Sequence, residues 1–228
     1  MLMRGVLNKL QALLFDIDGT LADTDALHLQ AFNAVFAPFG HAFDRARAAR
    51  ELLGRSNASI GAEFLPDERP ERRAAIMAQK EEVFRGLAAG AVQPLPGLMT
   101  LLDHAAAASI PVVAVTNAPR ANAELILRGL GITDRFRAVI IGDELPHGKP
   151  HPLPYLEGLR AADATPDCAV AFEDSRAGIA AATAAGITTI GMRTNLGHDE
   201  LIAAGAAISA AAFDEAEVLA LVKAGAPR

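Results

Sequence analysis

Five short apolar runs constrain the fold of this chain more than any other feature of its sequence. Each run is rich in Val, Ile, Leu or Phe and is apolar at consecutive positions, which is typical of strands buried on both faces of a sheet. Helical patterns separate the later runs, and strands that alternate with helices predict a parallel, doubly wound α/β sheet. The predicted strands are residues 12–16, 111–116, 138–143, 169–174 and 187–192.

The segment between residues 22 and 92 interrupts this alternation. Large apolar side chains recur in its first part at spacings of three, four and three, which is the period of an amphipathic helix. They are Leu29, Phe32, Phe36 and Phe39. No convincing strand follows before residue 93. We therefore predict an all-helical domain over residues 22–92, inserted into an α/β core domain of residues 1–21 and 93–228.

Composition indicates a globular protein and argues against two classes of partner. Of the 228 residues, 51% are hydrophobic and 21% are charged, which allows a substantial core in one large or two smaller domains. The net charge is −6 and no long basic run occurs, so we expect no general nucleic-acid binding. No apolar stretch is long enough to span a bilayer, and we expect no membrane association.

The chain contains one cysteine, Cys168, which excludes an intramolecular disulfide. The first ten residues carry no apolar segment with a cleavage site of the secretory type. Together these features favour a cytoplasmic location. Oligomeric state is not readable from the sequence, and a monomer is the default expectation.

Polar side chains follow four of the predicted strands. Because ligands of open α/β sheets bind beyond the carboxyl ends of the strands, we expect these side chains to meet at one edge. They are Asp16, Asp18, Thr20, Thr116, Asn117, Lys149, Glu173 and Asp174. Carboxylates without clustered His or Cys suit a hard cation, so the predicted metal is Mg²⁺.

Such a site provides what phosphoryl transfer requires, namely positioning and charge neutralisation. Lys149 adds a second positive charge, and Thr116 adds a hydroxyl donor. An Asp carboxylate can attack phosphorus and form an aspartyl phosphate. A second acid at short range can protonate the leaving oxygen and then deprotonate the attacking water. Gly19 would allow the sharp turn that brings this second acid into reach.

In type, order and spacing, these residues resemble the four motifs of the haloacid dehalogenase (HAD) superfamily. The motifs are DxDGT at residues 16–20, Thr116, Lys149 and the acidic pair Glu173 and Asp174. More narrowly, the chain resembles the β-phosphoglucomutase-like and phosphoglycolate-phosphatase-like branch, whose members carry a helical cap after the first motif. The resemblance covers essentially the whole chain and implies a Rossmann-like HAD core with an inserted cap.

The resemblance also implies a role for each motif residue. Asp16 would be the nucleophile and Asp18 the general acid and base. Asp16, the backbone carbonyl of Asp18, and Asp174 would hold Mg²⁺, with Glu173 acting directly or through water. The phosphoryl-binding residues implied are Thr116, Asn117 and Lys149.

Substrate contacts are expected from the cap. Asp18 favours phosphate-ester chemistry, because a dehalogenase is not expected to carry this second aspartate. The segment "LLGRSN" resembles the specificity segment of the mutases, typically "LKGVSR", but Leu53 and Asn57 replace the Lys and Arg that would hold a second phosphate. Arg55 could supply charge from a shifted position, and His28 matches a hinge histidine that mutases and phosphatases share. The candidate substrate contacts are Thr20, His28 and Arg55.

Structural roles are alternatives for several of these residues. Thr116 could cap the following helix, and Lys149 could be a solvated loop lysine. His28 could lie partly exposed on its helix, and Arg55 with Asn57 could face solvent. Asp23 and Asp25 are predicted to begin the cap helix as N-terminal charges, apart from the acidic cluster.

We expect a Mg²⁺-dependent phosphatase that hydrolyses a small phosphorylated metabolite, such as a sugar phosphate or a phosphoglycolate-like acid, through an aspartyl phosphate. A sugar phosphomutase would use the same residues but would exclude water and re-bind a bisphosphate. A non-catalytic phospho-receiver domain also combines acidic residues, Thr and Lys at strand ends. It would, however, be much shorter and would lack the helical insert.

Overall fold

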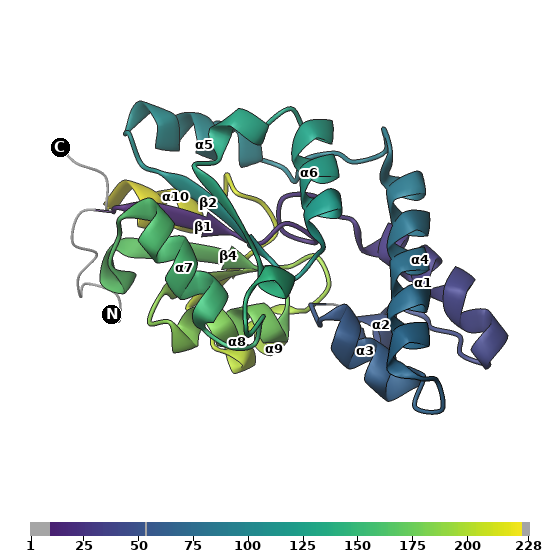
Figure 1. The fold of residues 1–228 in the computed structure, drawn as a ribbon. Helices are drawn as coiled ribbons and strands as arrows, with labels where there is room; N and C mark the ends of the chain where they lie inside the picture. The colour runs from purple at the N-terminus through teal and green to yellow at the C-terminus, as the bar shows by residue number, and fades with distance from the viewer. Residues whose placement is uncertain (1–9, 53, 225–228) are drawn as a thin grey trace.

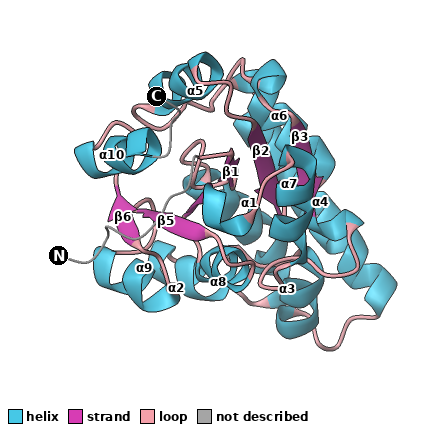
Figure 2. Ribbon diagram, turned by 90° about the vertical axis from the view of Figure 1, so that its left-hand side faces the viewer, coloured by secondary structure: helices cyan, strands magenta, loops and turns pink. Residues whose placement is uncertain are grey.

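The computed structural model describes residues 10–52 and 54–224, and a six-stranded parallel sheet lies at its centre (Figure 2). The strand order is β3-β2-β1-β4-β5-β6, and every neighbouring pair is parallel. The strands are β1 (Ala12–Phe15), β2 (Val112–Thr116), β3 (Ala138–Ile141), β4 (Ala169–Glu173), β5 (Thr188–Met192) and β6 (Ile208–Ala210). The predicted α/β fold class and all five predicted strands are confirmed, with ends one or two residues shorter.

The sixth strand, β6, was not predicted. It has three residues, Ile208, Ser209 and Ala210, within an Ala-rich stretch that carries no run of β-branched residues. It pairs only with β5 and forms one edge of the sheet. Tertiary pairing therefore decides its conformation where local propensity gives no signal.

Helices cover both faces of the sheet (Figures 1 and 2). One face packs against α5 (Leu98–Ala107), α6 (Arg120–Gly129) and α10 (Ala216–Ala224). The other face packs against α7 (Leu153–Ala162) and α8 (Arg176–Ala184), with α9 (His198–Ala204) beside α8. Short 3₁₀ segments complete the core, namely η2 (Thr133–Arg135), η3 (Gly142–Glu144) and η4 (Pro166–Cys168).

Burial on both sides explains the unbroken apolar runs. Leu13 and Phe15 of β1 join the core on the first face, whereas Leu14 joins the core on the second. Phe15 stacks on Phe172 of the neighbouring β4 with ring centroids 4.6 Å apart and planes within 8°. An alternating strand could not fill both cores, so the sequence must be apolar at every position.

A helical insert lies between β1 and β2 and packs at one end of the sheet (Figure 1). It consists of α1 (Asp25–Phe36), η1 (Ala37–Phe39), α2 (Arg45–Glu51), α3 (Asn57–Phe64) and α4 (Pro70–Ala88). Its own apolar cluster includes Phe32 and Phe36, as the helical spacing predicts. The chain enters and leaves the insert side by side, because the Leu95 N–H donates to the Leu21 carbonyl oxygen at 2.9 Å.

This insert is the predicted cap, although its boundaries at residues 21/22 and 92/93 stay a prediction. Among the described residues, no helix combines the length and the hydropathy that a membrane span needs.

Replacing Phe172 by Ala should destabilise the core strongly. Phe172 is fully buried and contacts the rings of Phe15 and Phe213, so the substitution leaves a cavity between β4 and the helices above it. We expect a loss of about 3–5 kcal/mol in the free energy of unfolding, measured by urea denaturation. Met99→Ala, at a half-exposed position, should change it by less than about 1 kcal/mol. Equal effects of the two substitutions would contradict this packing.

Candidate active site

The carboxyl ends of two adjacent strands bring three carboxylates together. Asp16 directly follows β1, Glu173 ends β4 and Asp174 follows it. Phe15 and Phe172 are paired in register, and the Asp16 N–H donates to the Phe172 carbonyl oxygen at 3.0 Å. One oxygen from each carboxylate lies within 4.8 Å of the others. The predicted meeting of these residues at one edge of the sheet is therefore present in the structure.

Lys149 lies buried against two of the three carboxylates. Its Nζ lies 2.5 Å from Asp16 Oδ1 and 2.5 Å from Glu173 Oε1. Burial alone would lower the pKa of Lys149, but the charges of Asp16 and Glu173 outweigh burial and raise it above its ordinary value. The ammonium therefore stays charged, and Lys149 is not a solvated loop residue.

Asn117 holds the backbone around Lys149. Its Oδ1 accepts the Lys149 N–H at 2.9 Å, and its Nδ2 donates to the Lys149 carbonyl oxygen at 3.0 Å. These two bonds connect the loop after β3 to the end of β2. The same amide also donates to the Gly54 carbonyl oxygen of the cap at 3.3 Å.

Glu173 lies deepest of the three carboxylates and is fully buried. Its Oε1 accepts the Tyr155 hydroxyl at 2.8 Å, and its Oε2 accepts the Ser175 hydroxyl at 3.2 Å. A Cβ on Gly178 would lie 1.9 Å from the Glu173 carboxylate, so α8 can begin here only with glycine at that position. Tyr155 was not predicted, because the sequence of its helix, "LPYLEGL", gives no sign that its hydroxyl faces the site.

The charged forms of the other two carboxylates are disfavoured. Burial, and then the neighbouring Glu173 and Asp18 charges, raise the pKa of Asp16 well above its ordinary value despite the opposing effect of Lys149. Burial, followed by the charges of Asp25, Asp16 and Glu173, raises the pKa of Asp174 in the same direction. One lysine therefore does not balance this cluster.

Asp18 occupies a different environment two residues further along the chain. Its Oδ1 accepts the Thr24 hydroxyl at 2.7 Å and lies 3.0 Å from His28 Nε2. Burial raises the pKa of Asp18, but His28, Thr24 and Lys80 together outweigh burial and bring the pKa below its ordinary value. Asp16 and Asp18 therefore differ in their protonation behaviour.

His28 connects Asp18 to a lysine of the cap. Its ring is buried, stacks on Phe84 with centroids 3.8 Å apart, and places Nδ1 2.9 Å from Lys80 Nζ. Since an ammonium group can only donate, Nδ1 accepts from Lys80 and Nε2 carries the proton donated to Asp18. The alternative of a partly exposed helix residue is wrong for His28.

Lys80 and its neighbour Glu81 were missed by the sequence analysis. Both are buried, and Lys80 Nζ lies 3.0 Å from Glu81 Oε1. The run "QKEEVF" has the composition of a solvated helix face, which hides these residues. A signal existed, because Lys80 lies four residues from both Ile76 and Phe84 and so shares their buried stripe.

Asp25 requires a correction. It begins α1 as predicted, but it is not apart from the acidic cluster, because it is buried and its charge acts on Asp174. Asn195 Nδ2 donates to Asp25 Oδ2 and, at 3.2 Å, to Asp174 Oδ2, so this amide connects the cap to the core. Burial, and next the Asp23 carboxylate, raise the pKa of Asp25 to about 7. Asp23 itself is exposed.

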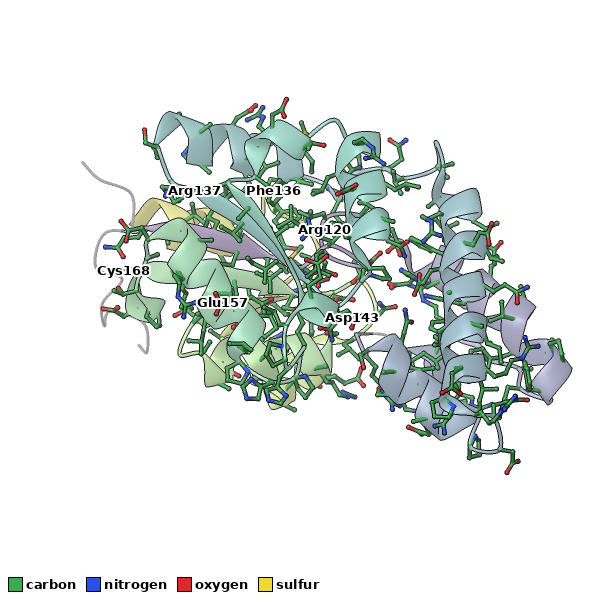
Figure 3. The ribbon with its side chains drawn as sticks, in the orientation of Figure 1. Arg120, Phe136, Arg137, Asp143, Glu157 and Cys168 are labelled. Carbon is green, nitrogen blue, oxygen red and sulfur yellow. The ribbon has the colours of Figure 1, made fainter. Side chains whose placement is uncertain are left out.

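A cavity between core and cap is lined by most of the residues that the sequence predicts for the active site. Its lining from the core includes Asp16, Asp18, Thr116, Asn117, Lys149 and Asp174. Its lining from the cap includes Asp25, His28, Arg55, Asn57, Lys80 and Glu81. Figure 3 shows Asp143, which follows β3, on the side of the cap, whereas Cys168, which precedes β4, lies at the far end of the sheet. The cavity is thus at the carboxyl ends of the strands.

The remaining candidate residues are placed as follows. Thr116 Oγ1 accepts the Ala118 N–H at 2.9 Å and does not cap α6, which begins only at Arg120. Arg55 lines the cavity, but its guanidinium donates to the Glu51 carbonyl oxygen and pairs with Glu63.

Thr20 is fully buried, is not among the lining residues, and its hydroxyl has no partner among the described residues. Leu53 lies outside the described residues.

The three clustered carboxylates fit a divalent metal ion. They offer hard oxygen ligands within a short distance of one another, and the raised pKa values of Asp16 and Asp174 mark a negative charge that a cation would neutralise. Gly19 holds the turn against this cluster, with φ of +76° and no room for a side chain, because a Cβ would lie 2.2 Å from Asp174 Oδ2.

A family model agrees with this arrangement. The model for haloacid dehalogenase-like hydrolases matches residues 13–192. The chain is a HAD hydrolase. The match begins in β1 and ends with β5, and so includes each residue of the acidic cluster.

Individual relatives place this HAD hydrolase more narrowly. It is 34% identical over 192 residues to protein CbbY of Rhodobacter capsulatus, covering 80% of this chain and 85% of that protein. It is 30% identical to the phosphorylated carbohydrates phosphatase of Thermotoga maritima, covering 79% and 84%. The crystal structure of CbbY from Rhodobacter sphaeroides in complex with phosphate superposes with a TM-score of 0.82 at 33% identity, covering 94% and 99%.

Relatives named as phosphatases show that this HAD hydrolase is a phosphoric monoester hydrolase of the β-phosphoglucomutase-like and phosphoglycolate-phosphatase-like branch.

Gly19→Ala should inactivate the HAD hydrolase, whereas Gly40→Ala should not. Both glycines have φ near +80°, so both variants should lose about 1 kcal/mol of stability from backbone strain. Only at position 19 does the new methyl group displace a carboxylate, since nothing lies within 4 Å of the Gly40 site. We expect hydrolysis of p-nitrophenyl phosphate with Mg²⁺ to fall about 100-fold in the Gly19 variant. Equal activity of the two variants would contradict the close contact with Asp174.

Asp25→Asn should change how stability depends on pH in the metal-free protein. The Asp25 pKa is about 7 in the folded state against an ordinary 3.8, so the stability that its protonation contributes is full below pH 3.8 and is lost as pH rises to about 7. The variant does not titrate there. The free energy of unfolding of the variant minus that of the wild type, measured by denaturation in EDTA, should therefore grow by about 4 kcal/mol across this range and then level off.

The surface substitution Asp134→Asn is the matched control and should show a constant difference from the wild type. A flat difference for Asp25→Asn as well would show that its carboxylate is not held protonated.

Proposed function

We propose that this HAD hydrolase uses Mg²⁺ and an aspartyl phosphate on Asp16 to hydrolyse a small phosphomonoester, such as a sugar phosphate or a phosphoglycolate-like acid. The observation that carries the proposal is the contrast between two neighbouring aspartates. Asp16 lies in a carboxylate cluster and contacts Lys149. Asp18 lines the same cavity but is hydrogen-bonded to Thr24 and His28.

In the first step, an Asp16 carboxylate oxygen would attack phosphorus as the ester oxygen leaves. Lys149 would neutralise charge on the phosphoryl oxygens, and the Thr116 hydroxyl would donate to one of them. Mg²⁺, when bound, supplies charge neutralisation, and the residues that would hold it are Asp16, the Asp18 carbonyl, Asp174 and, directly or through water, Glu173.

Asp18 would move the proton in both steps. In the first step Asp18 would take up a proton from solvent and give it to the leaving oxygen, and its lowered pKa favours the carboxylate that is needed as the base in the second step. In the second step this carboxylate would take a proton from the water that attacks the phosphorus of the aspartyl phosphate. The hydrogen bonds from Thr24 and His28 fix the carboxylate for both transfers.

The cap would control water and select the substrate. Residues 22–92 contribute His28, Lys80 and Glu81 to the cavity wall, whereas the core of residues 1–21 and 93–228 contributes the reacting carboxylates. Closure of such a lid excludes bulk water while the ester is cleaved. Admission of water after the leaving group departs would then complete hydrolysis.

The mutase alternative has weaker support. Asn57, at the position where the mutases carry Arg, donates to Glu81 at 2.9 Å. Arg55 is paired with Glu63 at 2.7 Å. A phospho-receiver role has no support, because the chain belongs to a hydrolase family and carries the helical insert.

Asp16→Asn should abolish hydrolysis of p-nitrophenyl phosphate, because the amide is a poor nucleophile for phosphorus. Asp18→Asn should reduce turnover at least about 100-fold through loss of acid–base catalysis. The Asp18 variant should also accumulate phosphoenzyme, since attack by Asp16 needs less proton transfer with this activated ester than hydrolysis of the intermediate does. Mass spectrometry of the quenched protein checks this accumulation.

Full turnover by the Asp16 variant, or no turnover of any phosphate ester by the wild type, would overturn the proposed function.

A further inference from the structure

Glu81 places a negative charge in the wall of the catalytic cavity on the side of the cap. It lies on α4, is 5% exposed, and lines the cavity together with Lys80 and Asn57. Burial raises the pKa of Glu81, but Lys80, His28 and Asn57 outweigh burial and bring the pKa below its ordinary value. The side chain is therefore a carboxylate at neutral pH, paired with Lys80 in the cavity wall.

Three N–H donors hold the Glu81 carboxylate in place. Asn57 Nδ2 and Lys80 Nζ lie 2.9 and 3.0 Å from Oε1, and Asn122 Nδ2 lies 2.6 Å from Oε2. Asn122 is fully buried on the core helix α6, and Arg85 Nη1 donates to its Oδ1 at 3.0 Å. A carboxylate accepts about four hydrogen bonds, so about one acceptor position is left for a further donor.

The cations that could accommodate a second phosphate already have partners within the protein. Among the described residues that line the cavity, the cationic ones are Lys149, Lys80 and Arg55. Lys149 pairs with Asp16 and Glu173, Lys80 pairs with Glu81, and Arg55 pairs with Glu63. Lys149 belongs to the reacting phosphoryl group. At the cap end, the described residues offer the Lys80–Glu81 pair, which has no net positive charge, and no unpaired cation.

We propose that Glu81 is a specificity-determining residue that selects phosphomonoesters with an uncharged, hydroxyl-bearing group at the cap end and rejects bisphosphates. A sugar hydroxyl can donate to the remaining acceptor position of Glu81. A second phosphate could not donate to that acceptor position, and no unpaired cation among the described lining residues would offset its repulsion by the Glu81 carboxylate. This inference rests on the proposed phosphatase function and narrows its substrate class.

The test compares a matched pair of sugar phosphates as inhibitors of p-nitrophenyl phosphate hydrolysis in excess Mg²⁺. Fructose 6-phosphate and fructose 1,6-bisphosphate share one skeleton and differ by one phosphate. In the wild type, the inhibition constant of the bisphosphate should be at least about 10-fold higher than that of the monophosphate. Tighter or equal binding of the bisphosphate would overturn the proposal.

Glu81→Gln keeps the shape of the side chain and removes its charge. The inhibition constant of the bisphosphate should fall about 10-fold, while that of the monophosphate should change less than about 3-fold. Glu82→Gln removes the same charge from the next residue, which is exposed on α4. It should leave the ratio of the two inhibition constants, bisphosphate to monophosphate, unchanged. A ratio that does not move with Glu81→Gln, or that moves equally with Glu82→Gln, would contradict the assignment.

A second variant covers the case in which Glu81→Gln fails to fold. Asn57→Arg adds a cation to the same wall at a partly exposed position and should shift the ratio in the same direction. An unchanged ratio there would also contradict the proposal. If the wild type turns over neither p-nitrophenyl phosphate nor any other phosphate ester, the proposed function itself fails, and that result is distinct from an unexpected ratio of inhibition constants.

Discussion

The burial of three carboxylates around one lysine is the interaction on which the rest of this structure depends. Asp16, Glu173 and Asp174 meet because β1 and β4 are adjacent and parallel, and Lys149 Nζ lies 2.5 Å from two of them. Such a cluster would repel itself apart without compensation. Asn117 fixes the lysine backbone and Tyr155 donates to Glu173, so the core is built to hold this charge in place.

The cap completes the site because its polar side chains contact Asp18, which the core lysine Lys149 does not contact. A series of polar contacts connects Asp18 to His28, His28 to Lys80 and Lys80 to Glu81. Asn122 of the core donates to Glu81 at the end of this series. The pKa of Asp18 is thereby lowered beside a cluster in which burial raises the pKa of Asp16. The same series supplies the Glu81 carboxylate at the cap end of the cavity, so the contacts that tune Asp18 also shape the substrate site.

Much of the fold and core site could be predicted from the sequence, because strands buried on both faces leave unbroken apolar runs and their polar ends must share one edge. Asp16, Asp18, Thr116, Lys149 and Asp174 follow from that rule. β6 could not be predicted, since only its pairing with β5 defines it. Asp25 and Asn195 lie 170 positions apart and meet only in the folded chain. Lys80 and Glu81 have the composition of a solvent-facing helix, and their burial depends on the packing of α4 against α1 and the core.

Chemical identification of the phosphorylated residue tests the central claim most directly. The wild-type protein would be quenched during turnover of p-nitrophenyl phosphate with Mg²⁺, reduced with borohydride, and analysed by peptide mass spectrometry. An aspartyl phosphate is reduced to homoserine, so the account predicts homoserine at position 16 and an unmodified aspartate at position 18. Homoserine at another position, or phosphate ester turnover with no reducible intermediate at any quench time, would contradict the account.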